Sequence, residues 1–480
     1  MNRYLDLHDA YGTTLVSNDL GEFALLPRSV AASVRSGALS SSDPRYYDLL
    51  AKGLIDRPER GGKGLEQTVL RTRKAHMLEG PSLHIFVVTL RCDHACAYCQ
   101  VSRAAVGATG FDMSHADADA AIDRVFESPA QSLTVEFQGG EPTLRFDLIR
   151  YIVSRVVARN AMARRNIHFS LVSTLHHLKD DDLGFCADHG IHISTSIDGP
   201  RDIHNRFRHN PGEDSWERTI SQLKRVRAAL GHDGVVAMPT LTRAALASPH
   251  ALIDTYVDLE FNSVFLRPIS PYGFALKTRR AIGYPMSEFV SFYAKALEYL
   301  LTLNRTGTQM GETYSAVLLR HILTPFGSNY VDLRSPAGAG LGVLVYNYDG
   351  RVYPADEARM AAESGDARFA LGRVQQPLDE LISSSAMQWL MTGAVAGDLP
   401  GCNTCGFLPF CGADPVYHAA AHGDPVGDRE TSEFCQKHTG LFRILFGHLR
   451  DADPENMRTL LSWAFGRSRM DIVEPGYIET

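Results

Sequence analysis

The chain of 480 residues lacks the features that are typical of membrane, secreted and nucleic-acid-binding proteins. No uninterrupted apolar run is long enough to span a bilayer, and the opening residues, MNRYLDLHDAYG, contain no apolar signal region. Positive charge is not in excess, because the net charge is -7, and this argues against general nucleic-acid binding. We therefore expect a cytoplasmic protein with no membrane or nucleic-acid partner, long enough for roughly two to four domains.

Cysteine is scarce and unevenly placed. Seven of the eight cysteines fall into two groups: Cys92, Cys96 and Cys99, and then Cys402, Cys405, Cys411 and Cys435. In a cytosolic chain such groups indicate metal sites rather than disulfides. The eighth, Cys186, stands alone in LGFCADHG and is most simply a packed thiol.

The first group follows an apolar run, Ile85 to Leu90, which predicts a buried parallel strand that ends in a loop. The spacing C-x3-C-x2-C supplies three thiolates, which can hold three irons of a cubane cluster and leave the fourth iron open to a small molecule. Zinc is the alternative, but a closed zinc site needs four ligands. His94 is available as the fourth, yet it lies too close in sequence for easy tetrahedral geometry.

This stretch, with the aromatic Tyr98 directly before the last cysteine, resembles the signature loop of radical S-adenosylmethionine (SAM) enzymes. The resemblance implies that the open iron binds SAM through its amino and carboxylate groups. It also implies that one electron cleaves SAM to methionine and a 5′-deoxyadenosyl radical, which abstracts hydrogen from an unactivated carbon. The cofactor supplies this chemistry, and the protein orients it and excludes water.

From residue 82 onward, strand and helix patterns alternate. Strands are predicted at 83–90, 132–138, 167–173, 191–197, 234–241 and 263–269, and helices at 114–127, 144–163, 215–230 and 249–259. Ser114 and Ser248-Pro249 are credible helix starts. Six βα units predict an α/β fold, a partial (β/α)6 TIM-like barrel over residues 80–325, with the site at the carboxyl ends of its strands. The radical SAM family has this fold.

The second predicted strand ends in a glycine-rich motif: Gln138, Gly139, Gly140, Glu141 and Pro142. The glycines let backbone approach a ligand, and the carboxylate can receive an ammonium group. The motif resembles the GGEP motif of the family, which holds the amino group of SAM.

The next two strand ends supply further candidates for SAM binding. SLVST replaces the TNG of many relatives and leaves Ser173 as a polar contact. STSIDGPRDIHNRFR resembles the SxDG stretch of the family and the His-Asp-x-x-Arg that follows it, so Ser196 and Arg208 are candidates for the methionyl carboxylate. Asn205 stands where aspartate is usual and receives no role. A solvated surface arginine is the alternative for Arg208.

The sixth predicted strand ends in Leu266-Arg267-Pro268. Here we expect Leu266 to cover the adenine and Arg267 to face the substrate as a catalytic candidate. A structural ion pair is the alternative for Arg267.

The second cysteine group, C-x2-C-x5-C with Cys435 after 23 further residues, supplies four thiolates. Four thiolates close a cubane cluster, which would then move electrons or position substrate, but they also suit structural zinc. The region resembles the SPASM extension of radical enzymes, which commonly carries two auxiliary clusters. Ala355 and Pro415 stand where that pattern has further cysteines, so the resemblance implies one auxiliary cluster and two [4Fe-4S] clusters in all.

The stretch GVLVYNYDGRVYPADEARM predicts a hairpin that turns at Asp349-Gly350. Its Asp356, Glu357 and Arg359 would lie near the position of the missing cluster and are candidates for substrate chemistry, with a local salt-bridge network as the alternative. Residues 285–325 are predicted to be helical. A helix near 377–391 and helices to about 466 complete the predicted SPASM-like domain, residues 326–480, with a loose tail from 468.

Residues 1–75 predict a small separate unit. RYLDLHDAYGTTLVSNDLGEFALLP predicts short strands, the next two stretches predict helices, and residues 57–75 predict a partly helical linker. The pattern fits a winged-helix-like domain and resembles precursor-recognition domains, which bind a leader peptide by adding a strand to a sheet edge. A structural N-terminal cap is the alternative.

Two stretches, SNDLGEFALL and YPADEARM, resemble the His-Xaa-Ser system type of radical maturase. This resemblance implies a peptide-modifying oxidoreductase that acts on a ribosomally made precursor peptide and installs a side-chain cross-link. It also implies an electron donor such as flavodoxin or ferredoxin. Two alternatives stay open: a radical SAM enzyme that acts on a small molecule or a folded protein, and a non-catalytic iron–sulfur or zinc protein that binds a peptide.

Overall fold

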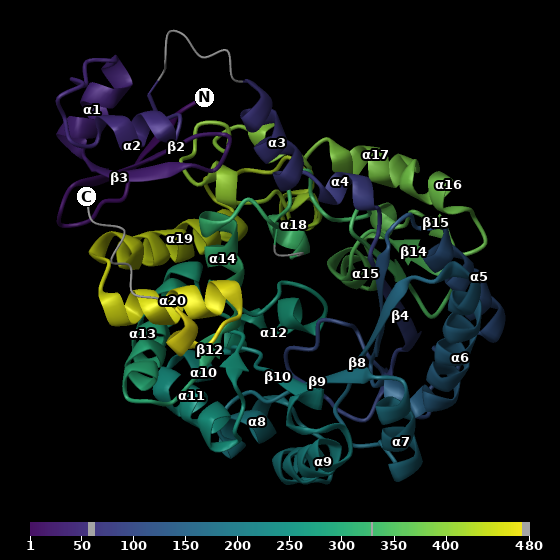
Figure 1. The fold of residues 1–480 in the computed structure, drawn as a ribbon. Helices are drawn as coiled ribbons and strands as arrows, with labels where there is room; N and C mark the ends of the chain where they lie inside the picture. The colour runs from purple at the N-terminus through teal and green to yellow at the C-terminus, as the bar shows by residue number, and fades with distance from the viewer. Residues whose placement is uncertain (56–62, 328–329, 473–480) are drawn as a thin grey trace.

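A computed structural model describes residues 1–55, 63–327 and 330–472 (Figure 1). Its central element is an eight-stranded sheet in the order β10-β9-β8-β7-β4-β13-β14-β15. The parallel strands are β4 (Leu83–Thr89), β7 (Ser132–Gly139), β8 (Asn166–Val172), β9 (Ile191–Ser196), β10 (Val235–Met238) and β13 (Val343–Tyr346). β14 (Arg351–Tyr353) and β15 (Gly372–Arg373) continue the sheet in antiparallel pairing. The predicted α/β fold with a mostly parallel sheet is confirmed.

The predicted sixth strand of this sheet is wrong. Only β11 (Ser263–Val264) forms there, and it pairs with β12 (Gly311–Glu312) instead of β10. Further along, Pro268 makes one isolated parallel bridge with Leu241, just after β10. Pro268 has no N–H to extend this bridge into a ladder, and the backbone N–H of Leu266 donates to the buried carboxylate of Glu312 at 3.0 Å. The sheet gains its sixth parallel strand from β13 instead, which pairs with β4 on the side away from β7.

Helices follow the first strands and cover the outside of the sheet (Figure 1). They are α5 (His115–Glu127), α6 (Phe146–Ala163), α7 (Asp180–Asp188), α8 (Arg201–Phe207), α9 (Ser215–Leu230), α10 (Arg243–Leu246) and α11 (Pro249–Asp258). The predicted helix starts are confirmed, since Ser114 caps α5 by accepting from the N–H of Asp117 and α11 begins with Pro249. β4 is buried along nearly its whole length, which explains its unbroken apolar run.

The N-terminal residues form a three-stranded antiparallel sheet and short helices, as predicted. The elements are β1 (Arg3–Asp6), β2 (Thr13–Ser17), β3 (Phe23–Pro27), α1 (Arg28–Ser36), α2 (Tyr46–Ala51), α3 (Lys63–Arg73) and α4 (His76–Glu79). Residues 57–62 of the predicted linker lie outside the described residues. The peptide-recognition role of this unit, and the division of the chain near residues 75 and 325, stay predictions.

The remaining helices belong mostly to the last third of the chain. They are α12 (Phe274–Ile282), α13 (Met286–Arg305), α14 (Thr313–Leu323), α15 (Asp356–Glu363), α16 (Leu378–Ile382), α17 (Ser385–Met391), α18 (Pro415–His422), α19 (Glu433–Asp451) and α20 (Pro454–Phe465). The hairpin at Asp349-Gly350 is confirmed. The helix expected near 377–391 is two helices, because Ser384 caps a new start.

Two short strands, β5 (Arg91–Cys92) and β6 (Ala104–Ala105), pair beside the first cysteine group. Residues 473–480 of the predicted loose tail lie outside the described residues. In the part of the chain that the structure describes, no helix is both long and apolar enough to cross a membrane.

Candidate active site

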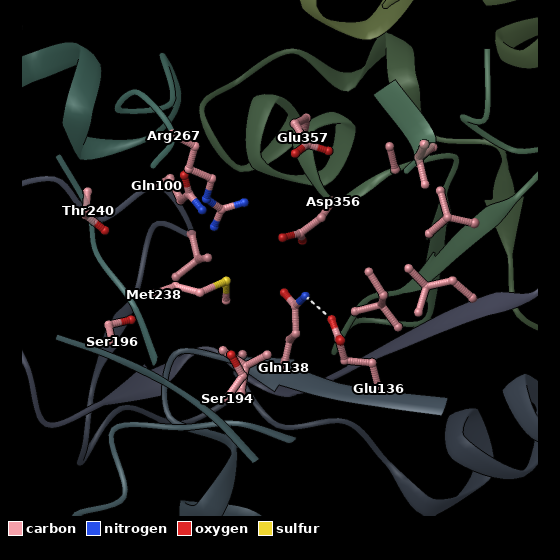
Figure 2. Close-up of a pocket in the computed structure, with 18 of the residues that line it drawn as sticks. Gln100, Glu136, Gln138, Ser194, Ser196, Met238, Thr240, Arg267, Asp356 and Glu357 are labelled. Carbon is pink, nitrogen blue, oxygen red and sulfur yellow. Dashed lines mark hydrogen bonds between the residues drawn. The ribbon is translucent and has the colours of Figure 1, made fainter. Parts of the chain in front are cut away.

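A cavity of about 620 Å³ lies at the carboxyl ends of the parallel strands, where the site was expected (Figure 2). Most predicted site residues line it: Cys92, Cys96, Tyr98, Cys99, Gln138, Gly139, Gly140, Ser173, Ser196, Arg208, Arg267, Asp356 and Glu357. Of the residues predicted for the first cluster, SAM and substrate, four do not: Glu141, Pro142, Leu266 and Arg359. The structure therefore gathers residues from β7, β8, β9 and α15 around the three-cysteine loop.

The three-cysteine loop is held by backbone hydrogen bonds from two directions. The N–H groups of Ala95 and Ala97 donate to the carbonyls of His209 and Phe207 at 2.7 and 2.9 Å. On the other side, the N–H of Phe274, the first residue of α12, donates to the Cys99 carbonyl at 2.8 Å. The loop is thus fixed between the end of α8 and the start of α12.

The environment of these thiols suits a metal centre. Burial raises the pKa of Cys96 to about 12 and also raises that of Cys92, so the free side chains are protonated thiols. Metal ligation replaces that proton, because the thiolate is the ligand. Arg208 opposes the effect of burial on Cys96, since its positive charge favours the thiolate.

His94 is already occupied, although its ring lies near Cys92 and Asp93. Its Nδ1 bonds to Asp93 at 2.8 Å and its Nε2 to the Ser215 hydroxyl at 3.0 Å. Asp93 also binds His177 Nε2 at 2.9 Å. With both ring nitrogens engaged, His94 braces the loop and is a poor fourth ligand for zinc.

The paired glycines after β7 allow that strand to meet the cysteine loop. A Cβ atom on Gly139 would lie 2.1 Å from the Thr89 carbonyl oxygen, and one on Gly140 would lie 2.4 Å from that of Leu90. Any side chain here would therefore separate β7 from the end of β4. The same close approach exposes the Gly139-Gly140 backbone to the cavity.

The Glu141 carboxylate, which we expect to receive the ammonium group of SAM, is fully buried. It accepts hydrogen bonds from the Ser173 hydroxyl at 2.8 Å and from the N–H groups of Thr143 and Thr174 at 3.0 and 2.6 Å. The Thr143 and Ser173 donors bind Oε1, and the Thr174 N–H binds Oε2, which can accept one further hydrogen bond. The role of Glu141 toward SAM stays a prediction. In the structure, its hydrogen bonds to Ser173 and Thr174 connect the ends of β7 and β8.

Arg208 lies in the cavity wall, which distinguishes it from a solvated surface arginine. Its Nη1 donates to the Tyr98 hydroxyl at 3.3 Å, and that hydroxyl donates to Asp198. Asp198 also accepts the N–H of Thr240 at 2.9 Å. Burial raises the pKa of Asp198, and the charge of Arg208 opposes that rise. Asn205 has a structural position instead, donating to Asp214 at 2.9 Å.

The opposite wall of the cavity comes from the last third of the chain and is rich in carboxylates. Figure 2 shows Asp356 and Arg267 pointing into the same space, with Glu357 behind Asp356. Burial raises the pKa of Glu357, and three neighbouring carboxylates, Asp332, Asp356 and Asp414, raise it further. Arg267 lies over the Phe265 ring at 5.3 Å, and no ion pair of this arginine occurs among the described residues.

Ala355 and Pro415, the two positions without the expected cysteines, both line this wall. The space that a first auxiliary cluster would take is therefore continuous with the cavity. Arg359 lies outside it, fully buried, with its Nε 2.8 Å from Asp356. Its ion pair with Asp356 agrees with the alternative of a local salt-bridge network.

One predicted contact, Leu266, differs in position from the expectation, and several lining residues carry no sequence motif. Leu266 is completely buried away from the cavity, and Met238, at the end of β10, and Thr240 line the wall instead. Asp332 and Asp414 were also missed. Asp414 precedes a proline and caps α18, so a helix-start pattern could have drawn attention to it.

The four remaining clustered cysteines surround a separate pocket of about 390 Å³. Its wall is largely apolar, with Phe407, Phe434 and Phe442, and its one arginine is Arg429. Burial raises the pKa of Cys435 to about 11 and raises that of Cys411 well above its ordinary value. Four partly buried thiols around one pocket suit a closed cluster.

Comparison with known proteins identifies the domain that carries the first cysteine group. Residues 86–248 match the Radical SAM superfamily. These residues are a radical SAM domain. The prediction of a radical SAM enzyme is confirmed at the level of the superfamily, which implies SAM and one [4Fe-4S] cluster.

A curated relative and two solved structures are also similar to this chain. A cysteine-type anaerobic sulfatase-maturating enzyme of Clostridium novyi (strain NT) is 30% identical over 88 residues. That match spans 18% of this chain and only 23% of the relative. The structure of anSMEcpe with bound AdoMet has a TM-score of 0.64 at 16% identity, covering 77% of this chain and 98% of that one.

A second similar structure is that of Streptococcus suis SuiB bound to precursor peptide SuiA. It has a TM-score of 0.54 at 14% identity and covers 88% of this chain and 96% of that one. At these identities the two structures show a shared fold.

Proposed function

We propose that this chain is a radical SAM maturase that modifies a ribosomally made precursor peptide, forming a side-chain cross-link, with SAM and two [4Fe-4S] clusters as cofactors. The observation that carries the proposal is the single cavity between the three-cysteine loop and the charged wall around Asp356 and Glu357. The similar structures support a peptide substrate, since anSMEcpe is described with a bound peptide and SuiB with its precursor peptide.

In this proposal, Cys92, Cys96 and Cys99 hold the cluster that binds SAM. When bound, the cofactor pair supplies a 5′-deoxyadenosyl radical that abstracts hydrogen from the peptide. The exposed Gly139-Gly140 backbone approaches the amino group, and Arg208, oriented through Tyr98 and Asp198, binds the carboxylate. Gln138, Ser173 and Ser196 complete the polar surroundings of SAM.

The charged wall orients the substrate side chain. Arg267 and Asp356 offer opposite charges across the cavity (Figure 2). Glu357 can hold a proton at a pH where an exposed glutamate is ionised, because burial and its acidic neighbours raise its pKa. It is the proposed acid or base for a substrate group close to the radical.

The N-terminal sheet is the proposed docking site for the leader of the peptide. In the order β1-β2-β3, β1 and β3 each keep one edge that pairs with no strand in the described chain. Such an edge offers backbone donors and acceptors to an added strand. The proposed SPASM-like region then presents the core of the peptide to the cavity.

The proposal is tested by anaerobic reconstitution followed by reduction with SAM. We expect 5′-deoxyadenosine to form, and a coexpressed candidate peptide to lose two hydrogens by mass spectrometry. Formation of 5′-deoxyadenosine without any peptide change would favour a small-molecule or folded-protein substrate. Failure to form it with an intact cluster would support a non-catalytic peptide binder.

A further inference from the structure

Arg429, in the segment between α18 and α19, is the one arginine in the wall of the four-cysteine pocket, and it is only partly satisfied. Its side chain is 8% exposed. Its Nε and Nη2 atoms are buried and have no hydrogen-bond partner in the described structure. A buried guanidinium with unmade hydrogen bonds is costly, so these two donors indicate an acceptor that the protein does not itself supply.

The third nitrogen of Arg429 fixes its orientation. Nη1 lies 2.8 Å from Nε2 and 2.9 Å from Nδ1 of His418, so it sits close to both ring nitrogens. His418 Nδ1 also lies 2.6 Å from the Asp414 carbonyl oxygen, which can only accept, so Nδ1 carries the proton. Nε2 is then the acceptor, shared by Arg429 and by the Ser432 hydroxyl at 2.9 Å. Burial lowers the pKa of His418 to about 4, which keeps the ring neutral. The histidine therefore anchors one nitrogen and adds no charge.

Arg429 lies beside the cysteines of this pocket. Its side chain lines the same wall as Cys402, Cys405, Cys411 and Cys435. The two donors without a partner, Nε and Nη2, therefore belong to a positively charged side chain that lies beside the thiols.

We propose that Nε and Nη2 of Arg429 donate hydrogen bonds to sulfurs of the auxiliary [4Fe-4S] cluster, and that this cation raises the reduction potential of the cluster. The inference rests on the proposed auxiliary cluster. A cubane with four thiolates is anionic and becomes more so on reduction, so a nearby fixed cation stabilises the reduced form more than the oxidised form. Hydrogen bonds to cluster sulfurs act in the same direction.

The test measures the auxiliary cluster alone, in full-length protein that carries Cys92→Ala, Cys96→Ala and Cys99→Ala. In this background, Arg429→Met removes charge and donors but keeps side-chain length, and Arg429→Lys restores the charge. Arg443→Met is the matched control, because Arg443 also lies near Cys405 but already donates to the Asp6 carbonyl at 2.9 Å. Iron, zinc and sulfide content, and redox titration followed by electron paramagnetic resonance, are the readouts.

We expect Arg429→Met to lower the midpoint potential, with about a tenfold change in the ratio of oxidised to reduced cluster at fixed potential, or to lose the cluster. We expect Arg429→Lys to recover most of the shift, and Arg443→Met to have a smaller effect. Unchanged potential and iron in Arg429→Met would overturn the proposal. Equal cluster loss in both Arg429 variants, or zinc in the parent background, would overturn it too. SAM cleavage by Arg429→Met with its first cluster intact tests the proposed function separately.

Discussion

The two cysteine sites differ in what surrounds the sulfurs. Three thiols stand at the edge of a cavity of about 620 Å³ that also exposes backbone, carboxylates and three arginines. Four thiols stand around a smaller, mainly apolar pocket of about 390 Å³ with one arginine. The first arrangement leaves room for a polar ligand at the metal, whereas the second suits a cofactor that exchanges electrons without binding substrate.

The sites also differ in what holds their loops. The first loop is held by α8 and α12 of the same domain. The second is held by the N-terminal sheet: Arg3 Nε donates to the Asn403 carbonyl at 2.9 Å, and the Ser17 hydroxyl to that of Gly406 at 2.7 Å. A Cβ on Gly406 would lie 2.7 Å from Leu5, so the contact is close. Residues far apart in sequence therefore shape the second site.

The largest expected effect is at the first site. Cys96→Ala should abolish formation of 5′-deoxyadenosine, because two thiolates cannot hold three irons. The isolated and buried Cys186 provides a control, and Cys186→Ala should retain cleavage. Equal 5′-deoxyadenosine yields from wild type and Cys96→Ala would rule out the assignment of this loop.

The second-largest expected effect is at the four-cysteine site, and it distinguishes this site from the three-cysteine site. Wild type should hold about eight irons in two four-iron clusters, and Cys402→Ala with Cys405→Ala should remove about half of them. SAM cleavage should remain at least in part while peptide product falls. Zinc in place of the lost iron would mark the second site as structural, and about twelve irons in wild type would show a third cluster.

Deleting residues 1–75 tests how far the second site depends on the N-terminal unit. We expect peptide affinity to fall much more than SAM cleavage, and the auxiliary cluster to be lost more readily to a chelator. Ser17→Ala is a smaller change at the same contact. It removes one buried hydrogen bond and should lower the free energy of unfolding by about 1 kcal/mol. Unchanged peptide affinity in the truncated protein would leave this unit as a structural cap.

The smallest expected effect concerns the charged wall of the first cavity. The pKa of Glu357 is raised in the folded protein, so folding favours its protonated form. Its stabilising contribution is therefore complete below the ordinary glutamate pKa and is lost as pH rises through the raised value. Glu357→Gln should melt at a higher temperature than wild type at pH 8, with the difference vanishing toward pH 4. The exposed Glu380→Gln should show no such trend.

The sequence alone was sufficient for features that depend on short spacing. The strand before Cys92, the glycine pair after β7, the cap at Ser114 and the hairpin at Asp349-Gly350 all lie where they were predicted. Strand periodicity, capping and turn chemistry act over a few residues, so a single chain reveals them.

Only the tertiary structure decided which distant segments meet. It placed β13 beside β4 and brought Asp332 and Asp414 to the cavity. It also paired β11, in the segment predicted as the sixth strand, with β12. It also surrounded the Glu141 carboxylate with donors and left two donors of Arg429 without a partner among the described residues. These outcomes depend on packing and on the balance of buried donors and acceptors across hundreds of residues, which local sequence patterns do not encode.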